Sequence, residues 1–181
     1  SSDVCSSDLR SESKKAQVWV ETVIYTLIGL TVIGLLLGVS MPVIQQQRDR
    51  ALIDQSINAL NKIDERVYDT LSGTGNKRKL ELKVGKGEII IDSENDRITW
   101  DIDSEYQYSE VGVNVSAGKV QFRTEAKGPW RVYLSLDFPF DIRYDDTQSL
   151  KQFSESSLPH VITIENIGII DNRTVISINE L

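Results

Sequence analysis

Cysteine and histidine are almost absent from this sequence of 181 residues, which contains one of each. Cys5 has no second cysteine with which to form a disulfide, so the fold must be held by core packing. His160 has no second histidine or usable cysteine with which to build a zinc site or a nucleophile–base pair. We interpret it, directly after Pro159, as an edge or loop residue. The sequence therefore predicts no catalytic residues, no metal, no cofactor and no enzymatic activity.

Basic residues are scarce relative to acidic ones. The chain has 20 Lys and Arg against 27 Asp and Glu, which gives a net charge of −7. Nucleic acid binding needs clustered Lys and Arg to displace counterions from phosphates, so this balance argues against a nucleic acid partner. The acidic stretches at residues 92–103 and 145–146 lack the Asp-x-Asp-x-Asp-Gly pattern of a tight calcium loop. We interpret them as solvated turns.

Residues 18–44 form one long apolar run, in which Glu21 is the only charged residue. As a helix with a rise of about 1.5 Å per residue the run spans roughly 40 Å, more than the ~30 Å hydrocarbon layer of a bilayer. It is too long for the apolar region of a secretory signal peptide, which has about 7 to 15 residues. We expect residues 17–44 to be a transmembrane helix that stays in the mature protein. Lys14 and Lys15 favour a cytoplasmic N-terminus, which places the chain beyond Ile44 outside the cell.

The segments on either side of this run differ in character. Residues 1–9 repeat Ser-Ser-Asp without apolar periodicity; we interpret them as a translated adapter, a disordered native leader being the alternative. Residues 10–16 form a basic leader. Pro42 removes one helical hydrogen bond and is expected to kink the helix or begin a new segment.

The segment from Lys14 to Thr22, with the sequence KKAQVWVET, resembles the processing site of archaeal type IV prepilins. In that family basic residues precede a small residue, a cleavage point, and an apolar helix with Glu at its fifth position. The resemblance implies cleavage between Ala16 and Gln17 by a prepilin peptidase, which makes Glu21 the fifth residue. It also implies, as partners, identical or related pilin subunits, an assembly ATPase and a platform protein, and it implies a structural role in a surface filament for adhesion or motility.

Glu21 is also a functional candidate on physical grounds. A carboxylate one turn inside a membrane helix is costly to insert and usually finds a partner, and the new ammonium of Gln17 on a neighbouring subunit is one candidate. Alternatively, Glu21 reaches water at the cytoplasmic interface and only favours the helix N-terminus. Gly34 and Gly38 are four residues apart and form a small-xxx-small face that permits close helix approach.

The sequence after Pro42 changes first to a helical and then to a strand period. Apolar residues recur at steps of three and four from Ile53 to Leu71, which predicts an amphipathic stalk helix over residues 45–72. Its apolar face is covered by the protein's own β-domain, by the same helix in neighbouring subunits, or by both. Residues 76–181 are predicted to form an extracytoplasmic antiparallel β-sandwich. The predicted strands are a hairpin of residues 80–84 and 88–92, and then residues 97–102, 111–115, 119–124, 130–138, 140–144, 160–165 and 173–178.

Two sequons, at Asn114 and Asn172, fall in predicted outer loops or strand ends, so both are candidates for N-glycosylation. The predicted fold class is α+β, a long N-terminal transmembrane and amphipathic helix followed by an antiparallel β-sandwich. The alternative to a filament subunit is a non-polymerising, single-pass surface protein whose β-domain binds a ligand or another envelope protein. A membrane-tethered hydrolase would require two carboxylates to converge in the folded domain.

Overall fold

The computed structural model describes the backbone from residue 5 to residue 181 and the side chains from residue 18 onward. The chain forms two compact units, one ending at Gln45 and one from Gln46 to Leu181. We call the second unit the head.

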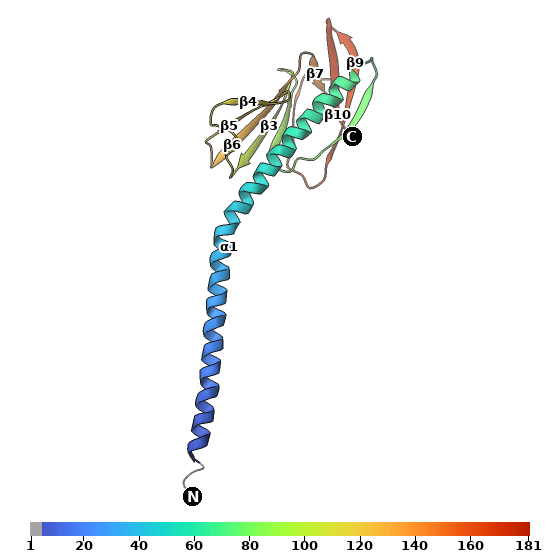
Figure 1. Cartoon of the computed structure of the whole chain (residues 1–181). Coiled ribbons are helices and arrows are strands. Elements are labelled where there is room, and N and C mark those ends of the chain that lie inside the picture. Colours follow the sequence, from blue (N-terminus) through green and yellow to red (C-terminus); the bar gives the residue numbers. More distant parts are fainter. Residues whose placement is uncertain (1–4) are drawn as a thin grey trace. The chain divides into compact units, whose positions relative to one another are not determined.

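One helix, α1, covers Cys5–Thr70 and continues through Pro42 without an interruption (Figure 1). Its end agrees with the predicted stop at the Ser-Gly-Thr-Gly sequence, because residues that follow Thr70 form turns. A residue that is distant in the sequence also stabilises the last turn of α1. The side-chain amide of Asn166 donates a hydrogen bond of 3.1 Å to the carbonyl of Thr70, which satisfies one of the carbonyls that every helix end leaves free.

The head contains two sheets. The four-stranded sheet has the order β1-β9-β10-β7 and the six-stranded sheet has the order β4-β5-β6-β3-β2-β8. Every pair is antiparallel except β10 and β7, which are parallel. The strands are β1 (Lys77–Leu82), β2 (Glu88–Asp92), β3 (Arg97–Ser104), β4 (Asn114–Ala117), β5 (Val120–Glu125), β6 (Trp130–Asp137), β7 (Asp141–Tyr144), β8 (Leu150–Ser154), β9 (His160–Ile170) and β10 (Arg173–Glu180).

The predicted hairpin of residues 80–84 and 88–92 is wrong. β1 pairs with β9 in one sheet, whereas β2 pairs with β3 and β8 in the other, so the connection between them crosses from sheet to sheet. Gly87 adopts a φ of +82°, and a Cβ there would lie 2.0 Å from the carbonyl oxygen of Asp101. The glycine signal was therefore genuine, but it marks a close approach of two backbones rather than a hairpin turn.

Two further strands differ from the prediction. β8 was missed, and it is an edge strand in which only Phe153 is buried. The strand predicted at residues 111–115 begins later, at Asn114, because Gly112 has a φ of +76° and interrupts the extended backbone. Val111 retains only an isolated bridge to Thr124. The remaining predicted strands are present with shifts at their ends.

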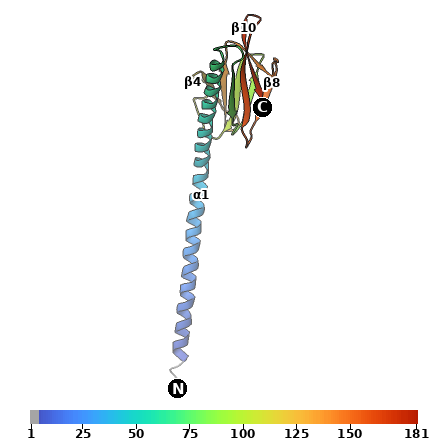
Figure 2. The ribbon, with the colours of Figure 1, turned by 90° about the vertical axis from the view of Figure 1, so that its right-hand side faces the viewer.

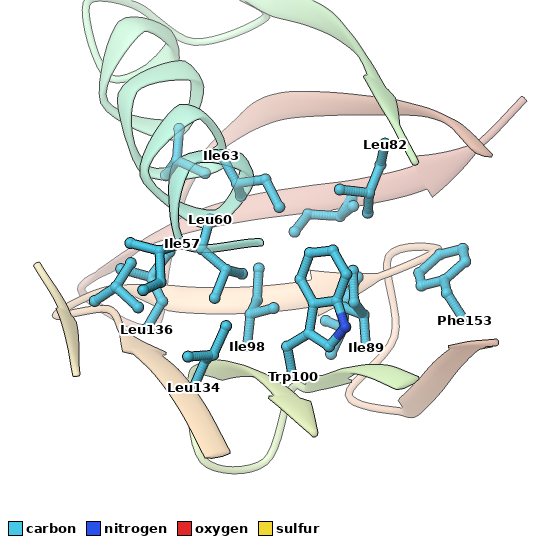
Figure 3. Packing of buried hydrophobic residues seen from close by; sticks show 14 of the residues in the cluster. Ile57, Leu60, Ile63, Leu82, Ile89, Ile98, Trp100, Leu134, Leu136 and Phe153 are labelled. Atoms are coloured by element: carbon cyan, nitrogen blue, oxygen red, sulfur yellow. The ribbon is translucent and has the colours of Figure 1, made fainter. Parts of the chain in front are cut away.

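The apolar face of α1 within the head is part of the head's core. Its buried residues, between 0 and 6% exposed, are Ile53, Ile57, Leu60, Ile63 and Val67. They belong to one hydrophobic cluster with residues of both sheets, including Leu82 from β1 and Trp100 from β3. In Figure 3, Leu60 and Ile63 lie opposite Ile98 and Trp100 of the six-stranded sheet. The cover of this face in the structure is thus the head's own strands.

Helix and strands of the head also lie side by side in both ribbon views (Figures 1 and 2). Contacts outside the core agree with this arrangement, since the amide of Asn61 donates a 3.3 Å hydrogen bond to the carbonyl of Ala117. A helix that contributes five side chains to a core shared with two largely antiparallel sheets confirms the α+β class.

Candidate functional site in the apolar segment of the N-terminal helix

Residues 18–44 of α1, which we call the apolar segment, expose every side chain. The large apolar side chains in it range from 39% exposed at Val23 to 72% at Val39. Among the described residues α1 is the one helix that is long and apolar enough to cross a membrane, by length and composition. A helix that is apolar on all sides is stable only where lipid or other protein surrounds it.

The threonine and serine hydroxyl groups of the apolar segment are satisfied within the helix. Thr22 donates a hydrogen bond of 2.9 Å to the carbonyl of Val18, four residues earlier. The same bond to the carbonyl four positions back occurs at Thr26, Thr31 and Ser40, with distances of 2.8, 2.8 and 2.7 Å. These hydroxyls therefore do not need water, which makes them compatible with a hydrocarbon environment.

Glu21 differs from these hydroxyls. Its side chain is exposed, and within the part of the chain that the structure describes it has no hydrogen-bond or ion-pair partner. It is the single charged residue of the segment. The side chains of Lys14, Lys15, Ala16 and Gln17, which with Glu21 make up the predicted processing and assembly site, lie outside the described residues. The structure thus places Glu21 on a helix surface without bringing a partner to it.

The glycines of the apolar segment leave open helix surface. A Cβ added to Gly29, Gly34 or Gly38 would meet no atom within 4 Å. With 3.6 residues per turn, Gly34 and Gly38 lie within about 40° of each other around the helix axis, whereas Glu21 is about 140° from Gly34. The carboxylate and the small-residue face therefore point in different directions, and the helix presents distinct features to neighbours on more than one side.

Both predicted glycosylation sites are exposed in the head. Asn114 begins the edge strand β4. Asn172, with a φ of +66°, occupies the turn between β9 and β10 together with Asp171, whose φ is +49°. Accessibility is the structural condition for N-glycosylation, and both asparagines meet it.

His160 begins β9 in a mixed polar and aromatic setting. Its Nδ1 lies 2.9 Å from Oε1 of Glu180, and its ring contacts Phe153 edge-on. The hydrogen bond with His160 and the ammonium of Lys151, 3.1 Å from Oε2, hold the pKa of Glu180 below its usual value. Among the described residues no group of three or more His, Cys, Asp or Glu side chains is placed to hold a metal ion.

The buried polar residues that position α1 in the head were not found from the sequence. Asp49 is fully buried and binds Lys86, and Asn166 is 4% exposed and holds the end of α1. An isolated Asp in a polar helix segment and an Asn in a strand carry no local signal of burial, because their partners are 37 and 96 residues away.

Comparison of the chain with known protein families, curated proteins and solved structures finds no match.

Proposed function

We propose that this chain is a structural subunit of an archaeal type IV pilus-like surface filament that serves adhesion or motility. In this proposal a prepilin peptidase cleaves between Ala16 and Gln17, and the protein polymerises through its N-terminal helix. It has no enzymatic activity. Before assembly the chain is a single-pass membrane protein with a cytoplasmic N-terminus and an extracellular head, which we take to be a β-sandwich with α1 filling part of its interior.

The observation that carries the proposal is Glu21. One carboxylate stands in a segment that has no other charge and whose threonine and serine hydroxyls form their own hydrogen bonds, and no described residue compensates it. Such a group in a membrane helix is costly to insert and usually finds a partner, and membrane helices retain such groups where they have a function. The resembled motif supplies that partner, because cleavage after Ala16 would create an ammonium at Gln17, four residues before the carboxylate. The ammonium of one subunit then pairs with Glu21 of the next.

Assembly exchanges lipid for protein around the apolar segment. Lipid tails are as apolar as leucine, so the gain comes from close packing rather than from removal of water. Gly34 and Gly38 offer one face for close approach, and Glu21 lies on another. Contacts on several sides suit a helix inside a bundle better than a helix in a simple dimer. The ATPase and platform protein implied by the resemblance would supply the energy for extraction from the membrane.

A second candidate is the non-polymerising, single-pass surface protein. It is favoured by the burial of the apolar side chains between Ile53 and Val67 of α1 in the chain's own head. The apolar stripe that the sequence offered to neighbouring subunits is fully occupied there, which leaves polar side chains such as Gln55 and Asn58 on the exposed side. Only the apolar segment remains available for a helical bundle.

N-terminal sequencing of the native protein combined with electron microscopy of sheared cell surfaces tests the proposal. We expect a mature N-terminus at Gln17 and filaments that contain the protein. Glu21→Ala should leave membrane insertion intact and stop incorporation into filaments, and Glu21→Gln should do the same because it keeps the shape but loses the charge. Thr26→Ala is the matched control. It removes a hydroxyl that is hydrogen-bonded within the same helix, and the variant should polymerise normally.

An intact Ala16–Gln17 bond in protein purified from native cells, together with an absence of filaments, would favour the second candidate. Normal filaments from Glu21→Ala would remove the role of the carboxylate even if cleavage occurs.

A further inference from the structure

The side of β1 that faces away from β9 is an unpaired sheet edge. β1 is the first strand of the order β1-β9-β10-β7, so it pairs on one side only. In an antiparallel pair, residues alternate between those that bond to the partner strand and those that turn their N–H and C=O groups away from it. The backbone N–H of Asn166 in β9 donates a hydrogen bond to the carbonyl of Asn76. The carbonyl of Val161 in β9 instead accepts a hydrogen bond from the N–H of Leu181 and so points away from β1. The alternate β1 residues, Lys77, Lys79 and Glu81, therefore point their backbone groups outward.

Two of these three residues keep their outward backbone groups free. The carbonyl of Lys77 accepts a 3.2 Å hydrogen bond from the guanidinium of Arg78. For Lys79 and Glu81, the described residues provide no hydrogen-bond partner on the outward side. Free backbone groups in a regular two-residue repeat are the template to which another strand can pair.

A groove runs along this edge. One wall is residues 55–62 of α1 and the other is residues 80–83, and the cavity between them has a volume of about 350 Å³. A second hollow of about 240 Å³ shares Gln55 and Lys83 with it and continues toward Trp100. The groove is therefore elongated in the direction of β1. Because the helix forms its far wall, there is space for an extended chain between helix and strand.

Taken together, β1 and the residues that line the groove beside it are mainly basic, although the protein as a whole is acidic. Residues 77–83 have the sequence KRKLELK, four basic residues with one acid, and exposed Lys62 adds a positive charge from α1. Lys77 alone of the β1 lysines has a carboxylate partner, Glu165, at 2.7 Å. Lysines on an edge strand discourage pairing with ordinary strands. A strand with opposite charges meets no such repulsion, so the same lysines select for it.

We propose that the groove between α1 and β1 binds an extended acidic peptide segment of a partner protein, which adds to the four-stranded sheet as a strand beside β1. Acidic side chains at alternate positions face Lys77 and Lys79. Apolar side chains between them face Leu80 and the helix wall. This site uses only residues of the head and does not depend on whether the chain polymerises.

Binding of a labelled octapeptide of alternating Glu and Val to the full chain in detergent micelles tests the proposal by fluorescence anisotropy. We expect it to bind at least about tenfold more tightly than the same peptide with N-methyl groups on the amides that face β1, because methylation keeps the charge and removes the ladder hydrogen bonds. Hydrogen exchange of the unmodified protein gives a direct second readout, in which the peptide slows exchange of the Lys79 and Glu81 amides.

Two variants separate charge from backbone pairing. Lys79→Glu should abolish binding, whereas Lys127→Glu, the same change on an exposed lysine in the connection between β5 and β6, should leave it unchanged. Glu81→Pro removes an outward N–H without touching the β9 pairing and should weaken binding about tenfold or more. Equal binding of the methylated peptide would reduce the site to general electrostatic attraction and overturn strand addition. Absence of binding, or of amide protection, would also overturn the proposal. The lysines of β1 would then serve only to prevent other strands from pairing with this edge.

Discussion

Asp49 of α1 and Lys86 of the β1–β2 connection form an ion pair in which Nζ lies 2.7 Å from Oδ1. The carboxylate is fully buried, and its Oδ2 accepts a 2.7 Å hydrogen bond from the backbone N–H of Glu105. The carbonyl of Lys86 accepts a 3.0 Å bond from the indole of Trp100. One helical carboxylate thus fixes the segment that crosses between the sheets and the residue that follows β3.

Asp49→Ala should lower the free energy of unfolding by about 3 kcal/mol, because the Lys86 ammonium and the Glu105 N–H lose their shared partner. Lys86 is 27% exposed and partly regains water, which keeps the loss at the lower end for a buried pair. Chemical denaturation of the detergent-solubilised protein measures the loss. Asp69→Ala is the control: it breaks an exposed ion pair with Arg66 on the same helix and should cost less than about 0.5 kcal/mol. Equal stability of the two variants would contradict the role of Asp49.

Periodicity predicted the elements of this fold better than their partners. The steps of three and four from Ile53 onward identified the buried helix face because burial of one face repeats with the helical turn. The connection at Gly87 was misassigned because its conformation depends on Asp49, Trp100 and Asp101, which are distant in sequence. The parallel pairing of β7 with β10 has no local signature for the same reason.

Leu60→Ala tests whether α1 is part of the head's core. Leu60 is 0% exposed, so the substitution should leave a cavity and lower the free energy of unfolding by about 2–5 kcal/mol. Denaturant unfolding followed through Trp100, in a chain in which Trp19 and Trp130 are replaced by Phe, reports on the head. Asn58→Ala, on the exposed side of the same helix, should change stability by less than about 0.5 kcal/mol. If Leu60→Ala is as mild as Asn58→Ala, the helix is not packed in the head.

Asp64→Asn should stabilise the head at neutral pH by up to about 1 kcal/mol. Burial raises the pKa of Asp64, and Lys119, with Nζ 3.6 Å from Oδ2, only partly offsets this. Its Oδ1 is buried and has no hydrogen-bond partner among the residues that the structure describes. A carboxyl whose pKa is higher in the folded protein favours folding below its unfolded pKa, and this contribution is lost as pH rises through the folded pKa.

Unfolding free energies of wild type and Asp64→Asn between about pH 3 and 7 measure this effect. The variant should lack the part of the decline that Asp64 causes. Glu65→Gln, an exposed neighbour, is the control and should follow the wild type. A destabilised Asp64→Asn at pH 7 would show that the pair with Lys119 outweighs desolvation.

Tyr108 should remain neutral well above the pH at which an ordinary tyrosine ionises. Burial is the largest cause and a 2.6 Å hydrogen bond to Oδ1 of Asp54 is the second; together they raise the pKa of Tyr108 from 10.0 to about 12. Between pH 10 and 12 the unfolded chain releases this proton and the folded chain retains it, so stability falls as pH rises through that interval.

The pH dependence of unfolding in Tyr108→Phe and Tyr106→Phe checks this expectation. Tyr108→Phe should be less stable than the wild type at about pH 8, with the difference shrinking from pH 10 to 12. Tyr106→Phe retains the hydroxyl bound to Asp54 and should keep the wild-type decline. Parallel profiles for wild type and Tyr108→Phe would refute the assignment.

The candidate sites differ in what the sequence reveals of them. The apolar segment and Glu21 are visible without a structure, because composition over a continuous stretch defines both. The groove is not, since its walls are residues 55–62 and 80–83 and its open edge exists only because β1 pairs with β9 rather than β2. A lysine-rich strand can have the same sequence whether it lies at the centre or at the edge of a sheet.

α1 contributes both the exposed apolar segment and part of the core of the head, and this determines where a soluble fragment can begin. A soluble version cut at the end of the helix, where the strands begin, would lose the five aliphatic side chains from Ile53 to Val67 and the carboxylate of Asp49. Such a fragment should aggregate. A cut near Gln46 removes the membrane-compatible stretch and retains everything that the two sheets enclose.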